Sequence, residues 1–245
     1  MNKIYLYILL LIGIIYLFRK YYNNEGTVIL KDHMEGNEEE INCEGKPVNS
    51  DYKKAWTDEN ILLFLQSEKI SRNEFVATVV AMYSGMRLDE ICNLQNKNIF
   101  DKCFHVEEGK TEAAARVIPV HPLIEPIIEN LKDSSKDEFL IKGINSGGYD
   151  NKRSWNFQKK LGRLRKKIGI PIEINFHTLR NTFATRMENL GIPTNHINKL
   201  MGHKHNNMSL DVYSAGLAIE PLVESINKLT YGDEIDSFIK ETLKN

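Results

Sequence analysis

Four residues between positions 177 and 213 carry side chains that are useful at a phosphodiester: His177, Arg180, His203 and Tyr213. An arginine holds a phosphate through two parallel hydrogen bonds. An imidazole donates to a phosphate or moves a proton near neutral pH. A tyrosine hydroxyl can act as a covalent nucleophile. The residue types and their order therefore indicate chemistry at a phosphodiester.

The sequence around Arg180 predicts a helix that positions these groups. Apolar residues recur there at three- and four-residue steps and predict one buried stripe, formed by Leu179, Phe183, Met187 and Leu190. His177 and Arg180 are three residues apart, so we expect both on one side near the helix start. The unpaired N–H groups at a helix start favour an anion at that position.

A second arginine lies upstream, in the run Met82-Tyr83-Ser84-Gly85-Met86-Arg87-Leu88-Asp89-Glu90. This run, followed later by His-Thr-Leu-Arg from His177, by Met-Gly-His ending at His203, and by Tyr213, resembles the two catalytic boxes of the tyrosine recombinases, the phage-integrase family. Two separate boxes in the right order make the resemblance specific, whereas a lone His-x-x-Arg occurs often by chance. The resemblance covers about residues 55–218.

The resemblance implies that Arg87 and Arg180 bind the same phosphate. Two guanidinium groups there would neutralise the charge that grows in the pentavalent transition state. Glu90 would be the acidic partner that positions an arginine. His177 would act as an acid or base or donate to the phosphate, and His203 would donate to a non-bridging oxygen.

Tyr213 is the nucleophile that the resemblance implies, and its attack would form a 3′-phosphotyrosyl link. A free phenol titrates near pH 10, so this tyrosine needs the arginines and a base nearby to react at neutral pH. Its distance along the chain from His203 is close to the usual gap in the family. Tyr231 lies too far beyond the box and Tyr83 lies upstream, so both are weaker candidates.

Residues 98–120 change from helical to strand periodicity. Short β-type runs at Ile99–Phe100, Phe104–Val106 and Arg116–Val120 are separated by turn residues, which predicts a small three-stranded antiparallel sheet. The resemblance places a catalytic lysine in this hairpin, and Lys110 in Gly-Lys-Thr matches it as the general acid for the departing 5′ hydroxyl. Lys97 and Lys102 are the alternatives for this role.

The rest of the folded region reads as helices. Thr57 and Ser71 are expected to cap the first two, and Gly85 to end the second. Further helices are expected over Leu88–Leu94, Pro122–Leu131, Asn151–Ile168, Ile219–Leu229 and Asp233–Leu243. The resemblance also allows the two acidic C-terminal helices to pack on a neighbouring subunit. The fold class is therefore mainly α with a small antiparallel sheet, as in the DNA breaking-rejoining catalytic domains.

The formal net charge is −1 and does not by itself indicate a nucleic-acid partner. Residues 51–218, however, hold 24 Lys and Arg against 20 Asp and Glu, and both ends are acidic. The helix expected over 151–168 is strongly basic, and each phosphate that it neutralised would add DNA affinity. The candidate DNA-binding residues are Lys152, Arg153, Lys159, Lys160 and Arg163. A solvated helix face is the alternative interpretation.

No cofactor or metal is expected. The three cysteines lack any C-x-x-C spacing, which favours a reduced cytosolic protein without a disulfide framework or zinc site. The resemblance implies that arginine and lysine supply the positive charge that Mg²⁺ provides in other phosphoryl-transfer sites.

Ile4–Phe18 is an unbroken apolar run of 15 residues, somewhat short of the roughly 17–25 residues of a spanning helix. Tyrosines flank both ends, and the following Arg-Lys-Tyr-Tyr is not a signal-peptide cleavage site. Three interpretations stay open: an uncleaved membrane anchor, a hydrophobic leader from a displaced start site or gene remnant, and a buried helix. With an anchor, a DNA enzyme requires residues 23–245 on the cytoplasmic side.

The sequence thus divides into a hydrophobic segment (1–22), an acidic linker (23–52), an integrase-like catalytic domain (53–218) and a C-terminal helical tail (219–245). Family members usually carry a separate helical core-binding domain that completes a clamp around DNA, and only about fifty residues precede Trp56. That half of the clamp is therefore expected to be absent, which predicts weak DNA affinity or a partner that supplies it.

The leading hypothesis is a site-specific DNA recombinase or integrase of a mobile element, cytoplasmic and homo-oligomeric on duplex DNA. A type IB topoisomerase shares the chemistry and is the related alternative. A decayed or truncated integrase that only binds DNA, or is only tethered to a membrane, is the alternative of a different class.

Overall fold

The computed structural model describes residues 28–31, 38–41, 55–107, 115–133, 138–203 and 218–244. The chain separates into two units, Met1–Lys53 and Lys54–Asn245. In the first unit, β1 (Val28–Lys31) pairs antiparallel with β2 (Glu38–Ile41), so that Val28 lies opposite Ile41. The interpretation of this stretch as a linker did not include that hairpin.

Within the described part of the chain, no helix combines the length and apolar character needed to cross a bilayer. The hydrophobic run Ile4–Phe18 lies outside the described residues.

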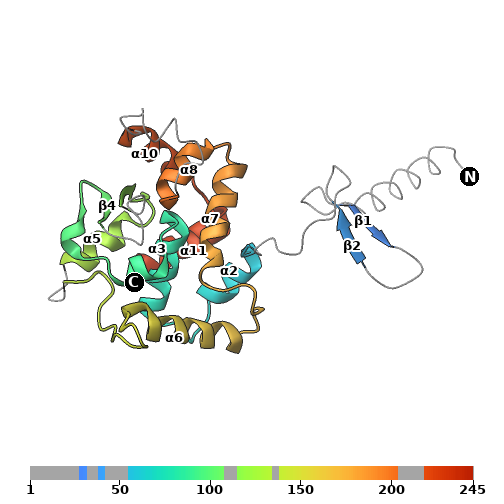
Figure 1. Cartoon of the computed structure of the whole chain (residues 1–245), viewed down its shortest axis with the longest axis horizontal. Coiled ribbons are helices and arrows are strands. Elements are labelled where there is room, and N and C mark those ends of the chain that lie inside the picture. The colour runs from blue at the N-terminus through green and yellow to red at the C-terminus, as the bar shows by residue number, and fades with distance from the viewer. Residues whose placement is uncertain are drawn as a thin grey trace, which may run out of the picture. The chain divides into compact units, whose positions relative to one another are not determined.

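The second unit is mainly helical (Figure 1). Its helices are α2 (Asp58–Leu65), α3 (Arg72–Ser84), α4 (Leu88–Cys92), α5 (Glu125–Asp133), α6 (Arg153–Lys167), α7 (Thr178–Asn189), α8 (Thr194–Met201), α10 (Ile219–Asn227) and α11 (Asp233–Lys244). A single 3₁₀ turn, η1 (Asn96–Asn98), follows α4. The predicted helices are present, with starts displaced by two or three residues at α5 and α6.

Local capping explains where α2 and α3 begin. The Thr57 side chain accepts a hydrogen bond from the Asn60 N–H at 3.2 Å. At α3, the Ser71 hydroxyl accepts from the Glu74 N–H at 3.3 Å, and the Glu74 carboxylate accepts from the Ser71 N–H at 2.8 Å. The single bond at Thr57 and the reciprocal pair at Ser71 satisfy N–H groups that a helix start leaves unpaired, so both predicted starts are confirmed.

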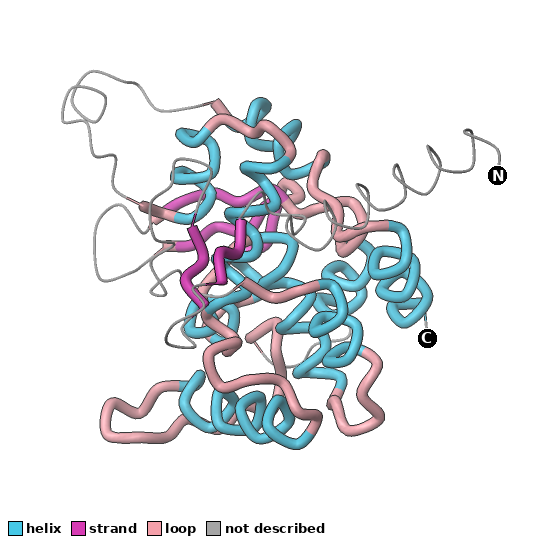
Figure 2. The backbone as a smooth tube through the Cα atoms, turned by 90° about the vertical axis from the view of Figure 1, so that its right-hand side faces the viewer, coloured by secondary structure: helices cyan, strands magenta, loops and turns pink. Residues whose placement is uncertain are grey.

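The predicted three-stranded sheet is confirmed, and its order is β3 (Ile99–Phe100), β4 (Cys103–Val106), β5 (Arg116–Pro119), all antiparallel. Asp101 and Lys102 connect β3 to β4 with positive φ angles of 51° and 54°, which is the backbone of a tight hairpin turn. In β4 and β5, Phe104 lies opposite Ile118 and Val106 opposite Arg116. Figure 2 shows these strands in magenta among the helices.

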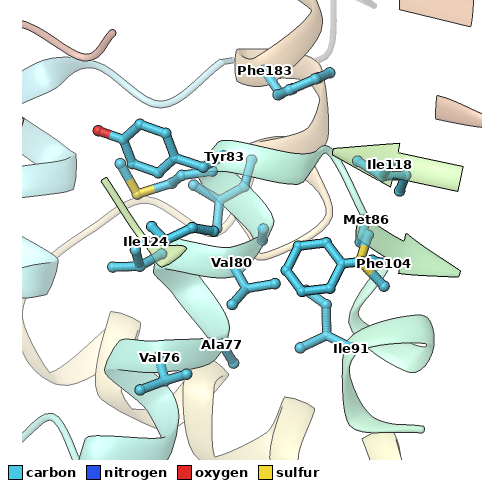
Figure 3. Close-up of a cluster of buried hydrophobic side chains, with 14 of the residues drawn as sticks. Val76, Ala77, Val80, Tyr83, Met86, Ile91, Phe104, Ile118, Ile124 and Phe183 are labelled. Atoms are coloured by element: carbon cyan, nitrogen blue, oxygen red, sulfur yellow. The ribbon is translucent and has the colours of Figure 1, made fainter. Parts of the chain in front are cut away.

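Helix α3 forms the centre of the core, since every residue from Glu74 to Ser84 is buried. A helix that is apolar on nearly all sides must be surrounded by other elements. Figure 3 shows this for α3 side chains such as Val80 and Tyr83, which lie in one cluster with Phe104 and Ile118 of the sheet and Phe183 of α7. The two segments that contain Arg87 and Arg180 therefore pack on a single core.

The C-terminal helices belong to the same unit. Residues of α10, α11 and the turn between them are buried in the core, namely Leu222, Ile226, Leu229, Tyr231, Ile235 and Ile239. The Tyr231 hydroxyl donates to the Met82 carbonyl at 2.8 Å, and the Tyr83 hydroxyl donates to Asp236 at 2.5 Å. Through these two bonds the predicted tail packs on α3 of its own chain.

Candidate active site

Arg87 lies in a sharp turn between α3 and α4. Gly85 ends α3 with a φ of 65°, and this left-handed backbone turns the chain so that Arg87 caps α4. The Arg87 N–H and its Nη1 donate to the two carboxylate oxygens of Glu90, each at 2.8 Å. The side chain of Arg87 keeps 38% of its surface exposed, so its guanidinium is accessible to an anion.

Glu90 joins Arg87 to a second, buried arginine. Arg116 Nη2 and Nη1 lie 2.7 Å and 3.1 Å from the two Glu90 oxygens, and Arg116 Nε donates to the Leu200 carbonyl at 2.7 Å. Burial by itself raises the pKa of the Glu90 carboxyl, but the bonds and charges of Arg116 and Arg87 outweigh it and hold that pKa below its usual value.

Sequence reasoning missed Arg116, although the strand pattern contained a signal. Successive residues of a strand face opposite sides, so Arg116 shares its side of β5 with the fully buried Ile118. A charged residue on a core-facing position requires a partner of opposite charge. The sequence did not indicate which acidic residue that partner is.

Arg180 is buried on α7, with 4% of its surface exposed. Its guanidinium donates to the carbonyls of Gly85 and Met201, and its Nη2 lies 3.2 Å from His203 Nε2. Burial, then the positive charges of Arg87 and Arg116, lower the pKa of Arg180. The structure therefore concentrates positive charge beside the Gly85 turn, which a bound anion would stabilise.

The predicted stripe around Arg180 is confirmed in three of its four positions. Leu179, Phe183 and Met187 are each 0% exposed. Leu190 is 40% exposed, and this part of the prediction is wrong because α7 ends at Asn189 and Leu190 is its C-cap residue.

Of the two predicted histidines, the structure places His203 beside Arg180. Helix α8 ends at Gly202, whose φ is 65°, and the His203 N–H bonds back to the Asn198 carbonyl at 3.0 Å. This helix end presents His203 to Arg180. His177 is exposed at the start of α7, where its N–H donates to Asn175 Oδ1 at 2.9 Å, so it does not share the buried setting of Arg180.

Trp56 fixes the turn before His177. Its indole Nε1 donates to the Asn175 carbonyl at 3.0 Å, and its backbone N–H donates to Thr182 Oγ1 at 2.8 Å. Trp56 is 4% exposed. The first residues of the second unit are therefore bonded directly to the helix that carries Arg180.

Two predicted site residues, Lys110 and Tyr213, lie outside the described residues. The rival tyrosines are described, and both are held in the core. Burial is the largest cause that raises the pKa of Tyr83 and of Tyr231. Because both hydroxyls also donate to fixed acceptors, neither tyrosine is placed to act as a nucleophile.

The predicted DNA-binding residues lie in and beside α6. Lys159 and Lys160 are exposed, as are Lys152 and Arg163, and the Lys159 ammonium lies 3.3 Å from the centre of the Trp155 ring. Arg153 differs, because its guanidinium donates to the carbonyls of Cys92 and Ile141 and lies over the Phe139 ring. These contacts hold the start of α6 on the end of α4, and DNA binding by Arg153 stays a prediction.

Taken together, the described site contains Arg87, Arg180 and His203 beside one turn, with Glu90 and Arg116 behind them. Three guanidinium groups and one carboxylate leave an excess of positive charge, and one of the guanidinium groups is accessible. Such a site can bind a phosphate and stabilise additional negative charge on it.

Comparison with known proteins agrees with this geometry. The family model described as the phage integrase family matches residues 57–217. Tyrosine recombinase XerA of Pyrococcus horikoshii is 32% identical over 151 residues, which are 59% of this chain and 50% of that protein. Tyrosine recombinase XerA of Thermococcus kodakarensis is 27% identical over 179 residues, 71% of this chain and 62% of that protein. The chain thus spans between half and two thirds of the length of these relatives.

Solved structures with the same fold include the integrase of mycobacterium phage Brujita, with a TM-score of 0.54 and 15% identity over 76% of this chain and 63% of that one. A lambda integrase dimer bound to a COC′ core site has a TM-score of 0.51 and 22% identity over 64% of this chain and 47% of that one. The confirmed fold class is therefore a mainly α catalytic domain with a small antiparallel sheet.

Proposed function

Because the chain belongs to the phage integrase family, we propose that it is a tyrosine recombinase that cleaves and rejoins duplex DNA site-specifically through Tyr213. The observation that carries this proposal is the convergence of Arg87, Arg180 and His203, from three separate elements, on the turn at Gly85. Chance placement of polar residues gives no reason for two arginines and a histidine to meet there.

In the proposed reaction the Tyr213 hydroxyl gives its proton to a base, for which His177 is the candidate, and its oxygen attacks the scissile phosphorus. The bond from phosphorus to the 5′ oxygen breaks. A proton from Lys110 goes to the departing 5′ oxygen, so a 3′-phosphotyrosyl link and a free 5′ hydroxyl result. Attack of a 5′ hydroxyl on that link reverses the steps and rejoins the strands without ATP. Arg87 and Arg180 would stabilise the extra negative charge in both transition states, and His177 would serve as acid or base.

DNA is the proposed partner of α6. Lys152, Lys159, Lys160 and Arg163 are accessible on or next to that helix, and Figure 1 shows the helix along one edge of the second unit. We also propose that the protein acts as a homo-oligomer on DNA, since cleavage and exchange of two duplexes require several active sites. The lambda integrase structures, one a dimer on a core site and another a tetramer on a Holliday junction, illustrate such assemblies.

Covalent trapping tests the nucleophile. The chain would be incubated with nicked duplexes that span the DNA flanking its own gene, alongside random-sequence duplexes, and resolved on a denaturing gel. We expect a shifted protein–DNA band that Tyr213→Phe abolishes, because the variant has no hydroxyl to form the ester. Tyr149→Phe is the matched control, since the Tyr149 side chain is fully exposed and its loss should leave the band unchanged.

Absence of a band on both kinds of duplex would reject strand cleavage and favour a protein that only binds DNA. A band that persists in Tyr213→Phe would show that another residue is the nucleophile.

We propose a cytoplasmic location, with residues 23–245 facing the cytoplasm where Ile4–Phe18 acts as an anchor. Fractionation of cells that express the full chain or a variant lacking residues 1–22 tests this. A real anchor keeps the full chain in salt-washed membranes and releases the shortened variant, because burial of the apolar run supplies the membrane affinity. Recovery of the full chain in the soluble fraction would reject the anchor.

A further inference from the structure

We propose that Arg116 is a positioning residue that neutralises Glu90, so that the positive charge of Arg87 is left for the phosphate. This role rests on the proposed function, in which Arg87 binds the scissile phosphate. Arg116 itself does not bind the phosphate, because its side chain is 1% exposed.

Glu90 and a bound phosphate would compete for the positive charge of Arg87. A carboxylate oxygen 2.8 Å from Arg87 Nη1 orients that guanidinium but also competes with any phosphate for its charge. Arg116 supplies two further hydrogen bonds to the same carboxylate, at 2.7 Å and 3.1 Å. Because a bidentate arginine is the strongest ordinary partner of a carboxylate, Arg116 satisfies Glu90 and leaves Arg87 oriented but still positive.

The formal charge of the site changes with each substitution. The site has a formal charge of +2, from the three arginines Arg87, Arg116 and Arg180 and the one carboxylate of Glu90. Removing the Arg116 charge leaves +1, with Glu90 paired to Arg87 alone. Removing Glu90 as well restores +2 without restoring any of the packing that Arg116 provided. A charge effect and a packing effect therefore predict opposite results for the double variant.

Arg116 also connects the two halves of the site. Its Nε donates to the Leu200 carbonyl at 2.7 Å, and the carbonyl of the next residue, Met201, accepts from Arg180. The same helix end leads into His203. One buried guanidinium thus fixes the end of α8 relative to Glu90 and Arg87.

The test is a double-mutant cycle on the full chain, with inorganic phosphate as the probe and titration calorimetry at low ionic strength as the measurement. We expect Arg116→Met to weaken phosphate binding about tenfold, because Glu90 then neutralises Arg87. Arg116→Met combined with Glu90→Gln should bind phosphate within about threefold of the unmodified chain. Thermal unfolding of each variant identifies the temperature range in which it is folded.

A double variant that binds phosphate no better than Arg116→Met overturns the proposal, and so does an Arg116→Met variant that binds as tightly as the unmodified chain. Failure of the unmodified chain to bind phosphate also overturns it, because Arg116 then has no anion site to support. The matched control is Arg165→Met, since Arg165 also donates to main-chain carbonyls, those of Pro171 and Ile174. We expect that control to lose stability without losing phosphate affinity.

Arg116→Lys provides the test if the methionine variant does not fold. Lysine keeps the buried charge but has one nitrogen for the three acceptor atoms, so the variant should lose stability while phosphate affinity stays within about threefold. A folded lysine variant with a tenfold loss would contradict the proposal. Covalent trapping on DNA is scored separately, so a chain that binds phosphate through this cycle but forms no adduct would reject the recombinase function alone.

Discussion

Replacing Arg180 with lysine should lower the rate of covalent DNA adduct formation by about 10²–10³-fold, the loss typical of one removed transition-state donor. Arg180 uses its guanidinium to hold the Gly85 and Met201 carbonyls while its Nη2 lies beside His203. A lysine conserves the charge but has a single nitrogen, so it cannot meet both carbonyls and still face the phosphate. The measurement is single-turnover trapping with saturating duplex.

Arg186→Lys is the control for that result. Arg186 lies on the same helix, but it pairs with Asp58 and its guanidinium lies over the Tyr231 ring. We expect this variant to lose some stability and to keep the trapping rate of its folded fraction. Equal loss of rate in both variants would mean that helix packing, and not the phosphate contact, explains the effect of Arg180.

Replacing Gly85 with alanine should lower the free energy of unfolding by roughly 2–5 kcal/mol, from backbone strain and overpacking together. The φ of Gly85 is 65°, and a Cβ built there would lie 2.7 Å from Cδ1 of the Phe183 ring. Phe183, on α7, is fully buried. Figure 3 shows its ring in the cluster of buried side chains, so the ring has little space into which to move. Urea unfolding measures the loss.

Gly169→Ala separates the two causes. Gly169 has a φ of 84° but no atom within 4 Å of a built Cβ, so it should show only the strain, about 1–2 kcal/mol. A Gly85 variant no less stable than the Gly169 variant would show that the Phe183 ring moves aside. Any loss of phosphate affinity in Gly85→Ala would come from displacement of the carbonyl that Arg180 binds.

Local features of this fold were predictable because their causes lie within a few residues. Thr57 and Ser71 each accept a hydrogen bond from the N–H three residues on, and that spacing is visible in the sequence. The β3–β4 turn and the left-handed Gly85 are equally local. The resemblance added the site residues Arg87, Arg180 and His203, which the structure brings together.

Features that depend on distant partners were not predictable from one sequence. The partner of Arg116 lies 26 residues away and its carbonyl acceptor lies 84 residues away, so nothing in the local pattern identifies them. The same is true of Arg153, whose acceptor on Cys92 lies 61 residues away. The bond between Tyr83 and Asp236, which joins α3 to α11, spans 153 residues. A periodic pattern indicates which face of each helix is buried, but it does not identify the helix that packs against that face.

The two hydrogen bonds of Trp56 attach the beginning of the second unit to α7 and to the turn before it. A force applied to the backbone before Trp56 would therefore act on its bonds to the Thr182 hydroxyl and the Asn175 carbonyl. The side chain of Asn175 in turn accepts a hydrogen bond from the N–H of His177. Truncations and fusions that remove only residues before Trp56 keep these two hydrogen bonds. Those that remove Trp56 release the turn that holds His177, even though they lie more than a hundred residues from it in the sequence.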